Sequence, residues 1–179
     1  MSGSNAALLG ALLLGALNTL GDFLWAHYVA RHRAPLGLLH GALLLMALGL
    51  YLGVLRKRPL VGAAVGAAVG LASAAGYYAL APLLRFYAML VSWMALWLGF
   101  ALLDARVLQR QVPPREALIR GLIGAVASGL AFYSISGIWT RPRAGGPSYG
   151  YNFLCWTMAF LPGLMALLLK KPREGGAAP

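Results

Sequence analysis

Residues 59–84 read PLVGAAVGAAVGLASAAGYYALAPLL, a stretch without a single charged side chain. A helix needs about 20 mostly apolar residues to cross the hydrocarbon core of a bilayer. In hydrocarbon the backbone has no water to bond, so a helix, which satisfies its own hydrogen bonds, is the expected conformation. The stretch therefore predicts a membrane-spanning helix.

Five further apolar stretches fill most of the remaining 179-residue chain, at 5–29, 35–55, 86–108, 116–139 and 149–169. The chain is 60% hydrophobic and only 11% charged, which excludes a soluble globular domain of ordinary composition. The first stretch has no basic segment before it, so we expect a permanent helix and not a signal peptide. We predict an all-α integral membrane protein with one domain, residues 1–170, in which six transmembrane helices form a bundle with short loops. A disordered cytoplasmic tail, 171–179, follows it.

The basic residues set the expected orientation. One set of alternate loops and helix ends carries ten: Arg56, Lys57, Arg58, Arg106, Arg110, Arg115, Arg120, Lys170, Lys171 and Arg173. The other set carries five: Arg31, Arg33, Arg85, Arg141 and Arg143. Because cytoplasmic loops are enriched in Lys and Arg, both termini are predicted to be cytoplasmic. Richness in alanine, leucine, glycine and arginine favours a bacterial cytoplasmic (inner) membrane.

Charge and cysteine content exclude several classes of function. The net charge of +11 is scattered through loops and helix ends, a pattern typical of membrane anchoring. We therefore expect membrane lipids, and no nucleic acid, as partners. Cys155 is the one cysteine, so the chain has no intramolecular disulfide and no CxxC motif. No cofactor is expected.

Aromatic residues gather toward the predicted outer side. Of the thirteen Trp and Tyr residues, ten fall near the outer ends of the expected helices, and all three histidines lie on that side. An interfacial aromatic belt is one explanation, although such belts normally decorate both membrane surfaces. The alternative is an outward-facing cavity lined by aromatic and a few polar groups, which is the usual composition of a small-molecule site.

Asp22 is the acid closest to the membrane interior on this side. Gly15, Asn18, Asp22 and Trp25 recur at spacings of three and four, so they share one helix face. Asp22 lies about four residues, or roughly 6 Å, below the outer boundary. An ionised Asp facing lipid costs about 2.5–3.5 kcal/mol, so Asp22 is expected to face protein or water. It either pairs with Arg31, Arg85 or a helix end for structural reasons, or it belongs to a functional site.

His40 lies about five residues inside the second predicted helix, beside two glycines. The ordinary explanation is a buried neutral histidine bonded to a neighbouring helix, and the sharper hypothesis is a proton-transfer or ligand group opposite Asp22. His27 and His32, five residues apart, share no helix face and match no zinc spacing. No metal site is therefore predicted.

The last outer loop, 139–152, combines two cations with a Gly-Gly-Pro turn and several aromatic residues. Its arginines either grip a carboxylate or phosphate or only contact lipid head groups. The candidate ligand-binding residues are Asp22, Trp25, His40, Tyr77, Arg85, Trp139, Arg141, Arg143, Tyr149 and Asn152.

Two other patterns concern packing. Gly62, Gly66 and Gly70 form consecutive small-xxx-small steps that let another helix approach closely, either within the chain or from a partner protein. At the other boundary, Asp104 is expected to join Arg106 and Arg110 in an interfacial charge cluster.

Four functions follow as hypotheses. The first is a binding or accessory membrane protein whose outer pocket takes an amphipathic or anionic small molecule or lipid. The second is a small proton-coupled transporter that uses Asp22 and His40, although few polar residues occupy the cytoplasmic half. The third is an outer-leaflet lipid-modifying enzyme. Against this hypothesis, the sequence lacks the clustered carboxylates or the His-x-x-x-His spacing of metal-dependent lipid enzymes. The fourth is a purely structural subunit.

Overall fold

The computed structural model of the chain describes residues 2–28, 33–108, 112–139 and 148–169, and all regular structure within these ranges is helical. The elements are α1 (Gly3–Tyr28), α2 (Arg33–Leu55), α3 (Pro59–Leu84), the 3-10 turn η1 (Arg85–Tyr87), α4 (Ala88–Leu102), the π-helical segment η2 (Leu103–Leu108), α5 (Pro114–Trp139) and α6 (Tyr149–Leu168). The described residues include six helices long and apolar enough to cross a membrane, with η2 continuing α4. The prediction of six apolar helices is confirmed, and their bounds differ from the expected ones by a few residues. The predicted tail lies outside the described residues.

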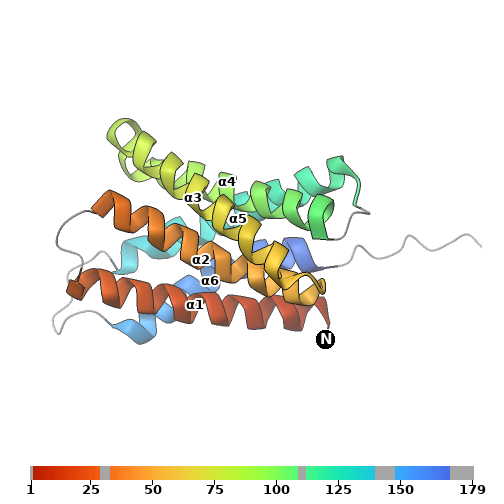
Figure 1. Cartoon of the computed structure of the whole chain (residues 1–179). Helices are drawn as coiled ribbons and strands as arrows, with labels where there is room; N and C mark the ends of the chain where they lie inside the picture. Colours follow the sequence, from red (N-terminus) through yellow and green to blue (C-terminus); the bar gives the residue numbers. More distant parts are fainter. Residues whose placement is uncertain (1, 29–32, 109–111, 140–147, 170–179) are drawn as a thin grey trace, which may run out of the picture.

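Successive helices run in opposite directions, so the bundle has two ends (Figure 1). The start of α1, the turn between α2 and α3 at Arg56–Arg58, η2 and the end of α6 lie at one end, which we call the basic end. The end of α1, the start of α2, η1 and the start of α6 lie at the other, which we call the aromatic end because Tyr28, Tyr87 and Tyr149 lie there. Around the bundle the helices follow the order α1, α6, α5, α4, α3, α2, and α1 touches α2 least extensively.

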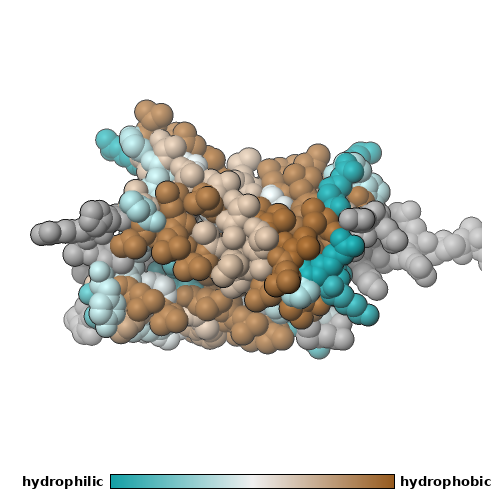
Figure 2. All heavy atoms as spheres, viewed as in Figure 1, coloured by the Kyte–Doolittle hydropathy of each residue, from teal (hydrophilic) through white to brown (hydrophobic). Residues whose placement is uncertain are grey.

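The surface of the bundle is apolar between its two ends. Figure 2 shows a wide hydrophobic band across the middle, with hydrophilic atoms gathered toward the ends and most strongly at the basic end. Leu60 and Leu83 are examples of large apolar side chains that are almost fully exposed. Such a surface is typical of a protein that is embedded in lipid.

The glycine face of α3 packs directly on α2. A Cβ atom added at Gly66 would lie 2.9 Å from the Gly49 Cα, and one at Gly62 would lie 2.8 Å from the Gly53 Cα. Real Cβ atoms do not approach backbone atoms so closely, so both helices need glycine at these positions. In this chain the face that the sequence marked for close packing is covered by α2.

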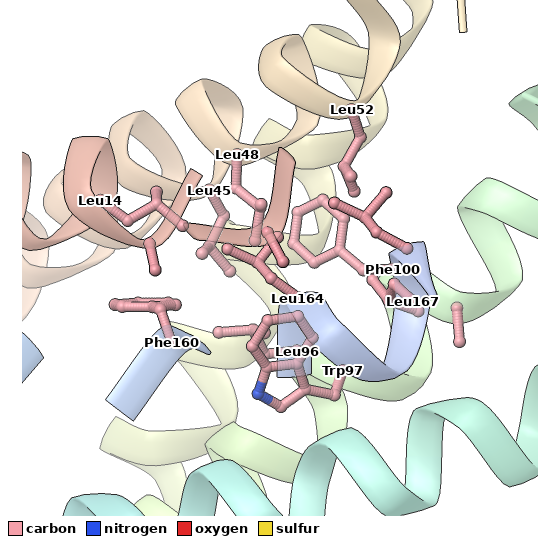
Figure 3. Close-up of a cluster of buried hydrophobic side chains, with 14 of the residues drawn as sticks. Leu14, Leu45, Leu48, Leu52, Leu96, Trp97, Phe100, Phe160, Leu164 and Leu167 are labelled. Carbon is pink, nitrogen blue, oxygen red and sulfur yellow. The ribbon is translucent and has the colours of Figure 1, made fainter. Parts of the chain in front are cut away.

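Large apolar side chains fill the middle of the bundle. Figure 3 shows this cluster, in which Trp97, Phe100 and Leu164 interdigitate between α4 and α6. The Trp97 indole lies against Gly163, where an added Cβ would collide with the ring. The middle of the bundle is therefore packed. At the basic end, a second cavity of about 360 Å³ lies between the start of α1 and the ends of α2 and α6.

Asp104 has a partner that the sequence did not indicate. It lies in η2 and is only 4% exposed, and its carboxylate accepts hydrogen bonds from Nε of Arg56 at 2.9 Å and from Nη2 at 3.2 Å. Arg56 comes from the α2–α3 turn, 48 residues away. Arg106, which the sequence places beside Asp104, is exposed, and Arg110 lies outside the described residues. This ion pair therefore joins two hairpins, and the expected contact of Asp104 with Arg110 stays a prediction.

Candidate functional site

A cavity of about 330 Å³ lies between α1, α2, α3, α4 and α6, in the half of the bundle nearer the aromatic end. This volume is at the lower end of the range for small-molecule sites. Aromatic side chains line it, namely Trp25, Tyr77, Tyr78, Trp93, Trp156 and Phe160. Polar side chains line it as well, namely Asn18, Asp22, His40, Ser73 and Ser92. On the face viewed in Figure 2, a small hydrophilic patch lies recessed between α1 and α2, within the apolar band.

The floor of the cavity is the top of the packed core. Leu45, Leu96 and Phe160 belong both to the buried cluster and to the cavity lining (Figure 3). Toward the basic end the packed core follows, and beyond it lies the second cavity of about 360 Å³. Among the described residues, the two cavities have no lining residue in common.

Asp22 is held by a tryptophan of another helix. The Trp156 Nε1–H donates a hydrogen bond of 2.7 Å to Oδ2 of Asp22, which ties α6 to α1. A hydrogen bond to an ionised carboxylate is roughly twice as strong as one between neutral groups. From the sequence, the expected structural partner of Asp22 was Arg31, Arg85 or a helix end. Arg31 lies outside the described residues. Nothing in the sequence connected Trp156 with Asp22.

His40 lies next to Asp22 across the α1–α2 interface. Its imidazole packs on Gly21, where an added Cβ would collide with the ring. The Trp25 ring stands edge-on to it, with ring centroids 6.5 Å apart. The imidazole and the Asp22 carboxylate both line the cavity and are close enough to interact electrostatically. The expected juxtaposition of His40 and Asp22 is thus present.

Two buried donors on the opposite wall have no hydrogen-bond partner among the described residues. They are the Ser73 hydroxyl on α3 and the Trp93 Nε1–H on α4, in side chains that are 5% and 4% exposed. The neighbouring Ser92 hydroxyl, by contrast, donates to the Ser73 carbonyl at 3.1 Å. Buried polar groups in native proteins are nearly always hydrogen-bonded, so a molecule in the cavity is the natural partner for these two donors.

Four of the ten candidate residues line this cavity: Asp22, Trp25, His40 and Tyr77. Whether they bind a ligand stays a prediction. Sequence reasoning did not select Tyr78, Ser73, Trp93 or Trp156. Ser73 could have been found from its position on the glycine face of α3, four residues before the candidate Tyr77.

The other candidates lie elsewhere. Tyr149 packs edge-on against Phe23 with ring centroids 5.5 Å apart, and Asn152 belongs to the first turn of α6. Arg85 is exposed in η1, in a backbone conformation with φ of 51°. Trp139 ends α5 with a side chain that is not described, and Arg141 and Arg143 lie outside the described residues. No Lys or Arg of the described ranges lines the cavity.

His27 does not join this site. It is exposed near the end of α1, and its Nδ1 hydrogen-bonds the Phe23 carbonyl at 2.8 Å. Within the described parts of the chain, no three His, Cys, Asp or Glu side chains gather in an arrangement able to hold a metal ion. The polar groups of the cavity are therefore suited to hydrogen bonding and charge recognition.

No protein-family model, curated protein or solved structure matches this chain.

Proposed function

We propose that this chain is an integral membrane binding protein that holds an amphipathic small molecule, or the head group of a lipid, in the cavity near the aromatic end. The observation that carries the proposal is the pair of buried, unpartnered donors, Ser73 and Trp93, in a cavity walled by aromatic rings. An apolar wall with a few convergent polar groups is what small-molecule recognition requires.

The proposal includes an orientation. Both termini and the basic end face the cytoplasm of a bacterium, and the aromatic end faces outward across the cytoplasmic membrane. The ten-to-five distribution of basic residues supports this orientation. A ligand would then enter from the outer leaflet or from outside the cell.

Transport is the second candidate, because Asp22 and His40 lie together in the cavity and form a pair that could exchange a proton. Transport needs access from both sides of the membrane in turn. In this conformation the Leu45, Leu96 and Phe160 floor and the packed core below it close the cytoplasmic route. A binding or accessory role requires no such rearrangement.

Native mass spectrometry of the protein, gently extracted from its own membrane, tests the proposal. We expect a bound molecule on the wild-type protein. Ser73→Ala should weaken retention about 5- to 10-fold, because a lost hydrogen bond costs about 1–1.5 kcal/mol. Ser134→Ala, the same change at an exposed serine of α5, is the matched control and should retain the ligand.

Two results would contradict the binding role. One is a bare protein mass for the wild type, and the other is equal retention by wild type and Ser73→Ala. A bare mass combined with pH-driven uptake into proteoliposomes, lost in Asp22→Asn, would favour the transporter.

A further inference from the structure

We infer that the occupant of this cavity is an organic cation, an amine or quaternary ammonium group of head-group size that also carries an oxygen acceptor. This inference rests on the proposed binding function and names the chemical class of its ligand. Three features of the described residues carry it: the charge balance of Asp22, the aromatic wall, and the two unpartnered donors.

The first feature is that Asp22 differs from the other described acids. Asp104 is paired with Arg56, and Glu116 with Arg120 at 2.6 Å, both at the basic end. In the described part of the chain no Lys, Arg or His nitrogen lies within ion-pair distance of Asp22, although His40 is close enough to interact with it electrostatically. Asp22 accepts its hydrogen bond from the uncharged indole of Trp156. A carboxylate within the membrane-spanning part of a protein is costly unless a positive charge is near it. A cationic ligand would supply that charge.

The second feature is the aromatic wall around this carboxylate. Trp25 and Trp156 stand on α1 and α6, and Tyr77 and Tyr78 form an edge-on pair on α3 with ring centroids 5.2 Å apart. The faces of aromatic rings attract cations, tryptophan most strongly, and quaternary ammonium groups are typically bound in such aromatic cages. An anion would face the same rings and the Asp22 carboxylate without a described Lys or Arg in the lining.

The third feature defines the rest of the ligand. The Trp93 Nε1–H is only a donor, so its partner must be an acceptor, and the Ser73 hydroxyl on the adjacent helix can donate to the same kind of group. A hydroxyl, ester or phosphate oxygen on the ligand would satisfy them. The cavity of about 330 Å³ accommodates a small head group of this composition.

Three probes of nearly the same shape separate charge from size: choline, the neutral 3,3-dimethylbutan-1-ol and the anionic 3,3-dimethylbutanoate. Binding is measured by tryptophan fluorescence on the purified protein in a neutral detergent. We expect choline to bind at least 10-fold more tightly than the alcohol, and the anion to bind most weakly. Asp22→Asn should abolish the preference for choline. Glu116→Gln, a carboxyl-to-amide change at the basic end, should preserve it.

The results also separate this inference from the proposed function. Equal binding of choline and the alcohol, a preference for the anion, or an unchanged preference in Asp22→Asn would each overturn the cation assignment while leaving a binding cavity. If no probe binds but native mass spectrometry still detects a Ser73-dependent ligand, the cation assignment fails and the binding function stands. If no ligand is detected either, both fail.

Discussion

Two acidic residues in this bundle are bonded to partners that are distant in the sequence. Arg56 and Asp104 are separated by 48 residues, and Trp156 and Asp22 by 134. In an apolar environment each such bond replaces interactions that water would otherwise make, so its loss leaves a buried group without compensation. The bond between Arg56 and Asp104 at the basic end joins two charged groups. The bond between Trp156 and Asp22 in the cavity joins an indole to a carboxylate.

The Arg56–Asp104 pair predicts unequal effects of removing either partner. Arg56→Ala removes this ion pair from the buried Asp104 carboxylate and should destabilise the fold by about 1–3 kcal/mol. Asp104→Asn leaves Arg56, whose side chain is 27% exposed and can reach water, and should cost less. Thermal unfolding in detergent compares the two variants. A smaller loss for Arg56→Ala than for Asp104→Asn would argue against the burial of Asp104 as the cause.

At the scale of elements, glycine determines how closely α2 and α3 approach. The small-xxx-small repeat of α3 meets Gly49 and Gly53 of α2, and the backbones touch where side chains would normally separate them. Because α2 carries His40 and α3 carries Ser73, this close contact also sets the distance between two walls of the cavity.

Two glycine-to-alanine changes on α3 should have opposite effects. At Gly66 the new methyl group would lie 2.9 Å from the Gly49 Cα and 3.1 Å from the Gly49 N, so Gly66→Ala should destabilise the protein by about 1–3 kcal/mol. At Gly76 nothing lies within 4 Å of an added Cβ, and Gly76→Ala should stabilise by about 0.5–1 kcal/mol through helix propensity. The melting temperatures of the two variants measure these opposite changes in stability. A higher melting temperature for Gly66→Ala would mean that α2 and α3 can move apart without a loss of stability.

At the scale of the whole molecule, a packed core lies between the cavity near the aromatic end and a second cavity at the basic end. Aromatic and polar side chains line the first cavity, whereas the second is lined by the start of α1 and the ends of α2 and α6. In the proposed orientation the aromatic cavity faces outward, and the core separates it from the cytoplasmic side.

Cysteine labelling tests the orientation. In a Cys155→Ser background, which removes a buried thiol, the exposed positions Tyr87 and Lys57 are each replaced by cysteine. A membrane-impermeant maleimide added to intact cells should label Tyr87→Cys at the aromatic end and leave Lys57→Cys unlabelled until the membrane is opened. The opposite pattern would invert the proposed topology and place the cavity on the cytoplasmic side.

The sequence also grouped some of the residues that line the cavity. The spacing of Asn18, Asp22 and Trp25 placed them on one face of α1, and all three line the cavity. The partner of Asp22 and the two unpartnered donors were not predicted, because helical spacing orders residues within one helix and says nothing about which helix lies opposite. The arginines that were expected around the pocket do not line the described cavity. Arg85 is exposed, and Arg141 and Arg143 lie outside the described residues.

The sequence by itself determined six helices, their approximate bounds and the glycine face of α3. Each of these follows from local properties: uninterrupted apolar length, the need for internal backbone hydrogen bonds in lipid, and periodicity along a single helix. Only the tertiary structure decided the order of helices around the bundle, the pairing of Asp22 with Trp156 and of Asp104 with Arg56, and the location of the cavity. These depend on the rotation and separation of helices, which close packing between distant segments sets.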